Sequence, residues 1–299
     1  MQLKIDHVTI AGAALTPLKD RFASVGLKAD FGGVHSNEIT HMACLPFDDG
    51  SYLELISTRQ PRAHSPLWHR HILGDAGLCA WAIEPPNMAD ELKRLGDLGV
   101  AVDGPTHMSR RWPDGALAEW DIAAVGEGDP GTILPFLIKD RTPRELRVPL
   151  RRGAAAEARL RADRLTGVVA MVLGVRHLEK AIALFRHVYD LPEPEIMENP
   201  LFGATLARFP DSPVVLATPL KQPSPPRIRR YDEDDRHWLE ARLHRFGDVP
   251  AACLLGVPDI ELVIERFEMD EDPEPWFNSQ AAWFDDRKLN GIRLGIVTI

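Results

Sequence analysis

The 299-residue sequence contains only three cysteines, Cys44, Cys79 and Cys253. They are too few and too far apart to predict a disulfide framework or a zinc site made of thiolates. Long apolar runs are also missing, since the longest, Leu165 to Val175, falls well short of the roughly 20 residues that a membrane-spanning helix needs. The first residues lack the apolar core of a secretory signal. These absences favour a cytoplasmic protein without a membrane partner.

Positive charge is scarce as well. The chain has 35 Lys and Arg against 44 Asp and Glu, and its formal net charge is -9. This is the wrong sign for a protein that binds nucleic acid by electrostatic attraction. A G-x-G-x-x-G match at 126–131 lies between two predicted strands, whereas a dinucleotide site needs the N-terminus of a helix there. We therefore expect a small-molecule ligand, no nucleic-acid partner and no nucleotide cofactor.

One pattern is present four times: a short apolar strand, a polar break and an amphipathic helix. Equivalent apolar residues recur near each helix start and seven residues later, which is one face of a helix. The first set is Leu15, Met88, Leu178 and Ile260, and the second set is Phe22, Leu95, Phe185 and Phe267. Each helix is followed by further predicted strands, so the unit is strand–helix–strand–strand–strand, or βαβββ.

The four units predict an α+β protein made of two domains with curved, mixed sheets. Each domain pairs two βαβββ modules, and the length of the chain allows a separate core for each. The first domain is expected at 1–145, with modules 1–58 and 76–145, and the second at 165–299, with modules 165–222 and 248–299. The Arg- and Ala-rich residues 146–164 are expected to form the linker.

The first half resembles the glyoxalase-like branch of the vicinal oxygen chelate (VOC) superfamily, the glyoxalase/bleomycin resistance/dioxygenase fold. The segments that carry the resemblance are IDHVTIA, GGVH with THMACLPFDDGSYLELI, SRRWPDG, Trp120 and LPFLI. The resemblance implies that paired modules form an open cup around a metal or ligand. It does not imply one reaction, because lyases, isomerases, ring-cleaving dioxygenases and drug-sequestering proteins share the fold.

The resemblance also implies that a metal is held by side chains on the first and last strands of a module. His7 matches the first-strand position and Glu54 the last-strand position of the first module, and alternation along each strand places both side chains inward. The other modules carry apolar residues at these positions: Ala80, Ala170, Ala252, Phe136 and Leu216. We therefore expect one divalent metal (Zn, Ni, Mn or Fe) on His7 and Glu54, and a packed, mainly structural cup in the second half.

Two protein ligands are fewer than the three that a catalytic zinc site normally has. A third ligand would come from a histidine on a neighbouring strand or loop, His35 or His41, or from the connection between the first two modules, His69 or His71. The alternative is that no metal binds, and that His7 and Glu54 hydrogen-bond each other or a ligand across neighbouring strands.

Arg110 and Arg111 lie on a predicted strand, where a guanidinium would bind a carboxylate or phosphate in a bidentate manner. Alternation allows only one of them to face inward, and the motif position favours Arg110. His41 is expected to line the same cleft. Trp120 and Trp81 are candidates for its walls, although tryptophans at such positions are more often part of a core.

Two functions remain open. The first is a divalent-metal-dependent lyase, isomerase or hydrolase-type enzyme for a small anionic, oxygenated metabolite, with His7 and Glu54 as catalytic residues and Arg110, His41 and Trp120 as substrate contacts. The second is a metal-free binding or sequestering protein of the bleomycin-resistance type. Glutathione-dependent glyoxalase chemistry and extradiol ring cleavage are not expected, because the second module lacks the carboxylate and histidine that they need. The protein is expected to be a monomer or a homodimer.

Overall fold

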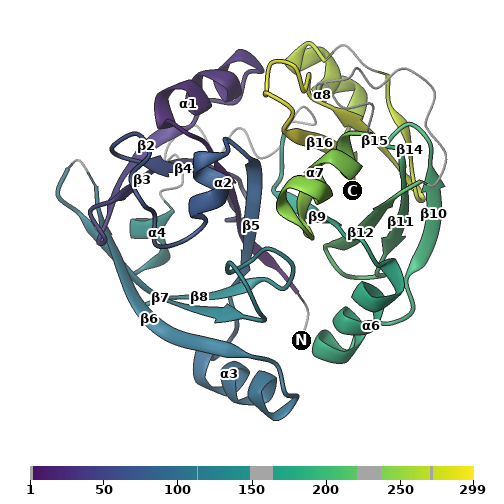
Figure 1. Cartoon of the computed structure of the whole chain (residues 1–299). Helices are drawn as coiled ribbons and strands as arrows, with labels where there is room; N and C mark the ends of the chain where they lie inside the picture. Colours follow the sequence, from purple (N-terminus) through teal and green to yellow (C-terminus); the bar gives the residue numbers. More distant parts are fainter. Residues whose placement is uncertain (1–2, 113, 149–163, 221–236, 270–271) are drawn as a thin grey trace.

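The computed structural model describes residues 3–112, 114–148, 164–220, 237–269 and 272–299 (Figure 1). Most of the expected linker and the proline-rich segment at 221–236 therefore lie outside the described residues. In the first half, one βαβββ unit is β1 (Ile5–Ala11), α1 (Leu15–Ser24), β2 (Asp30–His35), β3 (Thr40–Pro46) and β4 (Tyr52–Thr58). The other unit is β5 (Gly77–Ile83), α3 (Met88–Asp97), β6 (Val102–Arg111), β7 (Leu117–Val125) and β8 (Phe136–Asp140).

The second half repeats the same order. Its first unit is β9 (Val168–Gly174), α6 (Leu178–Tyr189), β10 (Glu195–Asn199), β11 (Ala204–Arg208) and β12 (Val214–Pro219). Its second unit is β13 (Val249–Val257), α8 (Ile260–Phe267), β14 (Glu274–Trp276), β15 (Ser279–Trp283) and β16 (Arg293–Thr298). In the described part of the chain, three further helices lie between units or after them: α2 (His69–Leu73), α4 (Arg144–Arg147) and α7 (Trp238–Phe246).

Each half has one curved, mixed sheet with an internal pseudo-symmetry. The first strands of its two units pair antiparallel at the centre, β1 with β5 and β9 with β13. Each of these strands also pairs in parallel with the last strand of its own unit, as β1 does with β4. The predicted α+β class with curved, mixed sheets is therefore confirmed.

The two sheets differ in how they close. In the first half, β2 pairs with β6, with Val34 opposite Arg111 and His35 opposite Arg110, and the eight strands form a closed barrel. In the second half, the eight strands form an open sheet that ends at β10 and β14. An open cup was expected in both halves. The closure places His35 beside Arg110, which matters for the site.

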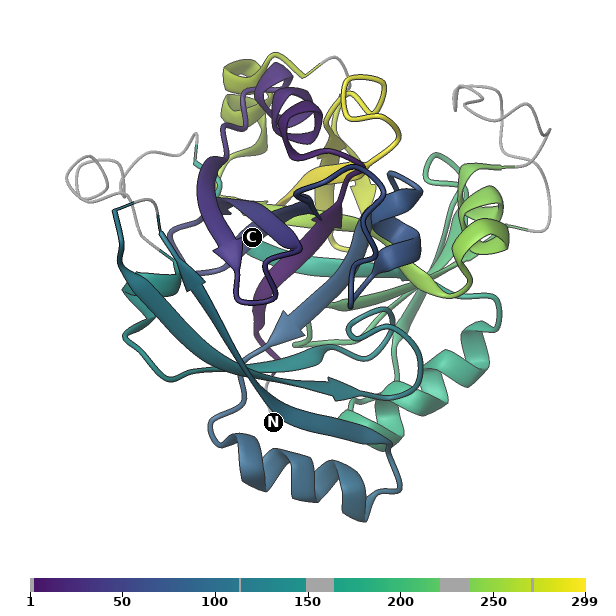
Figure 2. The ribbon, with the colours of Figure 1, turned by 60° about the vertical axis from the view of Figure 1, so that its left-hand side comes forward.

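The helices cover the outer faces of the sheets (Figures 1 and 2). Phe22, Leu95 and Phe185, which the sequence placed on the buried helix faces, are fully excluded from solvent. Phe267, the fourth member of that set, is half-buried. None of the helices in the described part of the chain is both long enough and apolar enough to span a membrane.

The two halves contact each other through their helices and first strands. α3 lies beside α6, where Arg94 Nη1 donates a hydrogen bond to the carbonyl oxygen of Val188 at 2.8 Å. α7 of the second half contacts the segment that leads into β5, because Arg242 Nη1 donates to the carbonyl oxygen of Ala76 at 2.8 Å. In both views α1 lies next to α8 (Figures 1 and 2).

Candidate functional site

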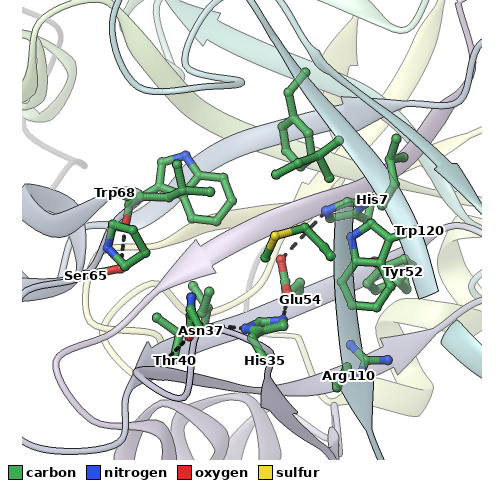
Figure 3. Close-up of a pocket in the computed structure, with 17 residues that line it drawn as sticks. His7, His35, Asn37, Thr40, Tyr52, Glu54, Ser65, Trp68, Arg110 and Trp120 are labelled. Atoms are coloured by element: carbon green, nitrogen blue, oxygen red, sulfur yellow. Dashed lines mark hydrogen bonds and ion pairs between the residues drawn. The ribbon is translucent and has the colours of Figure 1, made fainter. Parts of the chain in front are cut away.

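A cavity lies within the barrel of the first half, and the space in it, together with the part open to solvent, is about 540 Å³ (Figure 3). Two histidines, a carboxylate and a guanidinium line it: His7 on β1, His35 at the end of β2, Glu54 on β4 and Arg110 on β6. The rest of the wall is largely apolar or aromatic. His7 on β1 and Tyr52, Glu54 and Ile56 on β4 line the cavity, which is consistent with alternation along these strands.

Glu54 is at the centre of the polar contacts (Figure 3). Its carboxylate accepts a hydrogen bond from Thr9 Oγ1, 3.1 Å from Oε2. Nε2 of His7 lies 3.7 Å from Oε2, and Nε2 of His35 lies 3.4 Å from Oε1. Burial alone would raise the pKa of Glu54, but the hydrogen bond from His35 and the charges of His7 and His35 lower this pKa to about 2. The carboxylate is therefore ionised at neutral pH.

The ring of His7 is fixed by Asp6, the residue before it. Nδ1 of His7 lies 2.7 Å from Oδ1 of Asp6. Burial alone would raise the pKa of Asp6, but the charge of Arg147 and the hydrogen bond from His7 hold it well below its ordinary value. Because an ionised carboxylate only accepts hydrogen bonds, Nδ1 of His7 must be the donor. Nε2 is thus the nitrogen that faces Glu54, and the ring of Tyr52 stacks on the imidazole at 4.7 Å.

His35 has the same arrangement with neutral partners. Its Nδ1 lies 2.9 Å from Oγ1 of Thr40, and the Thr40 hydroxyl donates to Oδ1 of Asn37 at 3.2 Å. The Thr40 hydroxyl also accepts from Nδ2 of Asn37 at 3.1 Å, and it can either accept from or donate to Nδ1 of His35. Nε2 of His35 faces the carboxylate. Asn37 also accepts from the backbone N–H of Thr40, so that the turn after β2 fixes the ring.

These contacts leave two imidazole Nε2 atoms facing one carboxylate. Because Nδ1 of His7 is the donor to Asp6, a neutral His7 directs the lone pair of Nε2 toward the Glu54 carboxylate. These two groups repel each other unless a hydrogen-bond donor or a positive charge lies between them.

Arg110 adds a second charge to the wall of the cavity. Its side chain is buried, with Nη1 against Sδ of Met42 at 3.1 Å and Nη2 donating to the carbonyl oxygen of Arg147 at 2.6 Å. Nε has no hydrogen-bond partner, and within the described ranges no carboxylate forms an ion pair with this guanidinium. The rings of Trp112 and Trp120 lie 4.9 and 5.7 Å from its Cζ.

The structure brings His7, Glu54, Arg110 and Trp120 together around the cavity. It does not bring His41 there. Thr40 and Met42 take the inner face of β3, so alternation turns His41 outward, where Nε2 contacts Oγ of Ser57 at 2.8 Å. The expectation that His41 lines the cleft is corrected for this reason.

Four other residues named as candidates also lie outside the cavity. Trp81 is fully buried in the core, with Nε1 donating to the carbonyl oxygen of Ile133. Arg111 is exposed and donates to the carbonyl oxygen of Gly115, as the alternation rule requires once Arg110 points inward. His69 packs against His64, and His71 stacks on Phe246 of the second half. Of the four histidines considered as a third metal ligand, only His35 reaches Glu54.

Several residues of the site were not predicted. Asn37 and Thr40 fix His35, and Trp68 and Phe136 form part of the wall. Asp6 could have been predicted as part of the site, because a charged residue at the start of a buried strand requires a partner and His7 follows it directly. Nothing in the sequence pattern pointed to Trp68, which lies in the connection between the two modules.

A divalent metal would find suitable donor types here, since imidazole nitrogen and carboxylate oxygen are ordinary zinc ligands. Within the described part of the chain, however, no three His, Cys, Asp or Glu side chains form a group that could hold a metal ion. The two Nε2 atoms contact different oxygens of Glu54 instead. The residues as arranged do not complete a three-ligand site.

The corresponding face of the second sheet is packed with aromatic side chains. The rings of Phe202, Trp276 and Trp283 lie 5.2 to 5.7 Å from one another. The strand register makes Val215 the equivalent of Glu54, whereas Leu216, the position expected from the sequence, belongs to the core beneath the helices. Either residue is apolar, so the second half has no counterpart of the His7 and Glu54 pair at these positions.

Replacement of Glu54 by Gln is expected to change how stability depends on pH. The pKa of Glu54 in the folded protein, about 2, is below its ordinary value of 4.5. Its contribution to the free energy of unfolding is therefore complete above pH 4.5 and is lost as the pH falls toward 2. Between about pH 5 and pH 3, the wild type should lose stability more steeply than Glu54→Gln, by up to about 1.4 kcal/mol per pH unit in urea unfolding. Equal slopes for the two proteins would contradict this account of the charge.

Comparison with known proteins adds to the geometry. The family model of the glyoxalase-like domain matches residues 5–185. A comparison with curated proteins finds no match. Among solved structures, a hypothetical protein from Staphylococcus aureus is similar over 99% of this chain and 100% of its own, with 12% identity and a TM-score of 0.61.

A xylose isomerase-like TIM barrel/4-hydroxyphenylpyruvate dioxygenase fusion protein is similar over 98% of this chain and 48% of its own, with 12% identity and a TM-score of 0.57. Methylmalonyl-CoA epimerase from Mycobacterium tuberculosis matches over 48% of this chain and 94% of its own, with 17% identity and a TM-score of 0.38. Identities this low do not transfer an activity. Since the family model matches more than half of the chain, and the fold is the paired βαβββ fold, the chain belongs to the glyoxalase-like domain family of the VOC superfamily.

Proposed function

We propose that the barrel cavity binds a small carboxylic acid with an apolar body, and that His7 moves a proton on this ligand. The observation that carries the proposal is the state of Arg110, a buried cation on the cavity wall that has no carboxylate partner among the described residues. Burying a charge without a partner is costly. A carboxylate ligand would offer both the negative charge and the acceptor oxygens that a guanidinium binds.

The walls support the apolar body. Trp68, Trp120 and Phe136 contribute aromatic surface, and Ile56, Ile122 and Ile138 contribute aliphatic surface. A wall of this composition is typical of small-molecule sites, in which a few polar groups orient a largely apolar ligand. The polar groups here are Arg110 and the group formed by His7, His35 and Glu54, which suits a ligand with a second oxygen beside the carboxylate.

The proton acceptor in this proposal is His7. Asp6 keeps the proton of the ring on Nδ1 and leaves Nε2 toward the cavity, which is how a carboxylate orients a histidine that acts as a general base. A C–H bond next to the ligand's carbonyl would break, the proton would pass to Nε2, and the electron pair would stay on the ligand as an enolate near Arg110. Glu54, with a pKa of about 2, is a weak base at neutral pH and supports the resulting imidazolium.

A divalent metal (Zn, Ni, Mn or Fe) on His7 and Glu54 is the second candidate. One observation favours it: both His7 and His35 use Nδ1 for a hydrogen bond and turn Nε2 toward Glu54, as metal-binding histidines commonly do. When bound there, such an ion would polarise the oxygens of the ligand. In the metal-free case the same groups would bind the ligand by hydrogen bonds alone.

The cellular setting belongs to the proposal as well. Cys44, Cys79 and Cys253 are all buried and free, which is typical of proteins in a reducing compartment. We therefore place the protein in the cytoplasm, acting on a small-molecule ligand, as a monomer or a homodimer.

Binding of phenylacetate and of its uncharged analogue phenylacetamide tests the role of Arg110. The wild type should bind phenylacetate at least about tenfold more tightly in calorimetric titrations, because a hydrogen-bonded charge pair contributes roughly 1.5 kcal/mol or more. Arg110→Gln should remove this preference. Arg111→Gln, which changes the exposed neighbour, should keep it. Failure of the wild type to bind phenylacetate, or an unchanged preference in Arg110→Gln, would count against the proposal.

Elemental analysis of the purified protein separates the two candidates. A metal site predicts one divalent ion per chain in the wild type and its loss in His7→Ala, Glu54→Gln and His35→Ala, because each variant removes a donor. His41→Ala should keep the ion, since His41 lies outside the cavity. Absence of metal from every sample, with phenylacetate still bound by the wild type, would reject the metal candidate and leave proton transfer or binding without a metal.

A further inference from the structure

Arg147, the last residue of α4, lies behind the cavity and does not line it. Its side chain is 1% exposed, although the sequence placed it at the start of the linker. An arginine in a surface linker would be solvated, so its complete burial beside the barrel requires a specific explanation.

Every N–H of the Arg147 guanidinium has an acceptor. Nη1 and Nη2 donate to the two carboxylate oxygens of Asp6, each at 2.9 Å. Nε and Nη2 donate to Asp140, and Nη1 also donates to the hydroxyl of Tyr52 at 2.9 Å. Five donors thus meet three residues in a planar, forked geometry that a lysine ammonium does not reproduce.

Through Asp6, this arrangement determines the state of His7. Arg147 fixes both oxygens of the Asp6 carboxylate, and Oδ1 of the same carboxylate accepts from Nδ1 of His7. Arg144 also donates to Asp6, at 2.5 Å from Oδ2. Its side chain is one-third exposed, however, and of the two Asp6 oxygens it contacts only Oδ2. The position of the acceptor beside His7 therefore depends mainly on Arg147.

The same residue also contacts the other end of the site. The carbonyl oxygen of Arg147 accepts a hydrogen bond of 2.6 Å from Nη2 of Arg110. One residue thus holds the histidine through its side chain and the buried cation through its backbone.

We infer that Arg147 is a positioning residue that sets the ring tautomer of His7 and the orientation of Arg110, although it does not itself reach the cavity. The inference rests on the proposed function in one respect: only if the cavity binds the proposed ligand do the tautomer of His7 and the orientation of Arg110 affect ligand binding. The tautomer of His7 does not depend on a ligand and is measured separately.

Nitrogen NMR of the histidine side chains in the full-length protein tests the inference. The His7 signal, identified by its loss in His7→Gln, should show a protonated Nδ1 in the wild type. In Arg147→Lys it should move toward a mixture of tautomers, and the dissociation constant for phenylacetate should rise at least tenfold. Asp140→Asn, which removes one charged acceptor of Arg147 and keeps the arginine, should shift both readouts in the same direction and serves if Arg147→Lys does not fold.

Arg141→Gln is the matched control, because Arg141 is an exposed arginine of the preceding loop that pairs with Asp121. It should leave both readouts unchanged. A folded Arg147→Lys or Asp140→Asn protein with the wild-type His7 spectrum and wild-type affinity would overturn the inference and leave Arg147 a structural residue only. If the wild type does not bind phenylacetate, the proposed function fails, while the His7 spectrum still decides the role of Arg147.

Discussion

The site depends on a chain of buried polar and charged side chains that runs from Arg147 beside the barrel to Glu54 in the cavity. Arg147, Asp6, His7 and Glu54 form a continuous series of contacts, and each is nearly excluded from solvent. In such surroundings, removal of one member leaves its partner as an uncompensated charge, which typically costs about 3–5 kcal/mol. The series therefore fixes which nitrogen of His7 carries a proton and which one faces the cavity. The proposal that His7 accepts a proton at Nε2 rests on these contacts.

Much of this architecture was predictable because it rests on local periodicity. The seven-residue spacing on four helices gave the buried faces, and it holds for Phe22 and Phe185. Alternation along strands placed His7 and Glu54 inward and allowed only one of Arg110 and Arg111 to face inward, and the motif position favoured Arg110. These rules need no knowledge of which strands are neighbours, so one sequence was sufficient.

The rest of the site depends on contacts between residues far apart in the chain. His35 lies opposite Arg110 because β2 pairs with β6 and closes the barrel, a pairing that no local pattern encodes. Arg147 contacts Asp6 across 141 positions of sequence, and its composition-based assignment to a linker gave no hint of burial. The position of His41, by contrast, is a local property: alternation along β3 turns its side chain outward, to Ser57, so the expectation that it lines the cavity was wrong.

Hydrogen–deuterium exchange tests the central claim most directly, namely that the cavity holds an oxygenated carboxylate while His7 moves its proton. The methylene protons of phenylpyruvate in D₂O are followed by proton NMR with catalytic amounts of protein. The account predicts exchange faster than in buffer for the wild type, loss of this acceleration in His7→Gln, and its retention in His41→Gln. No acceleration by the wild type, or equal acceleration by His7→Gln, would contradict it.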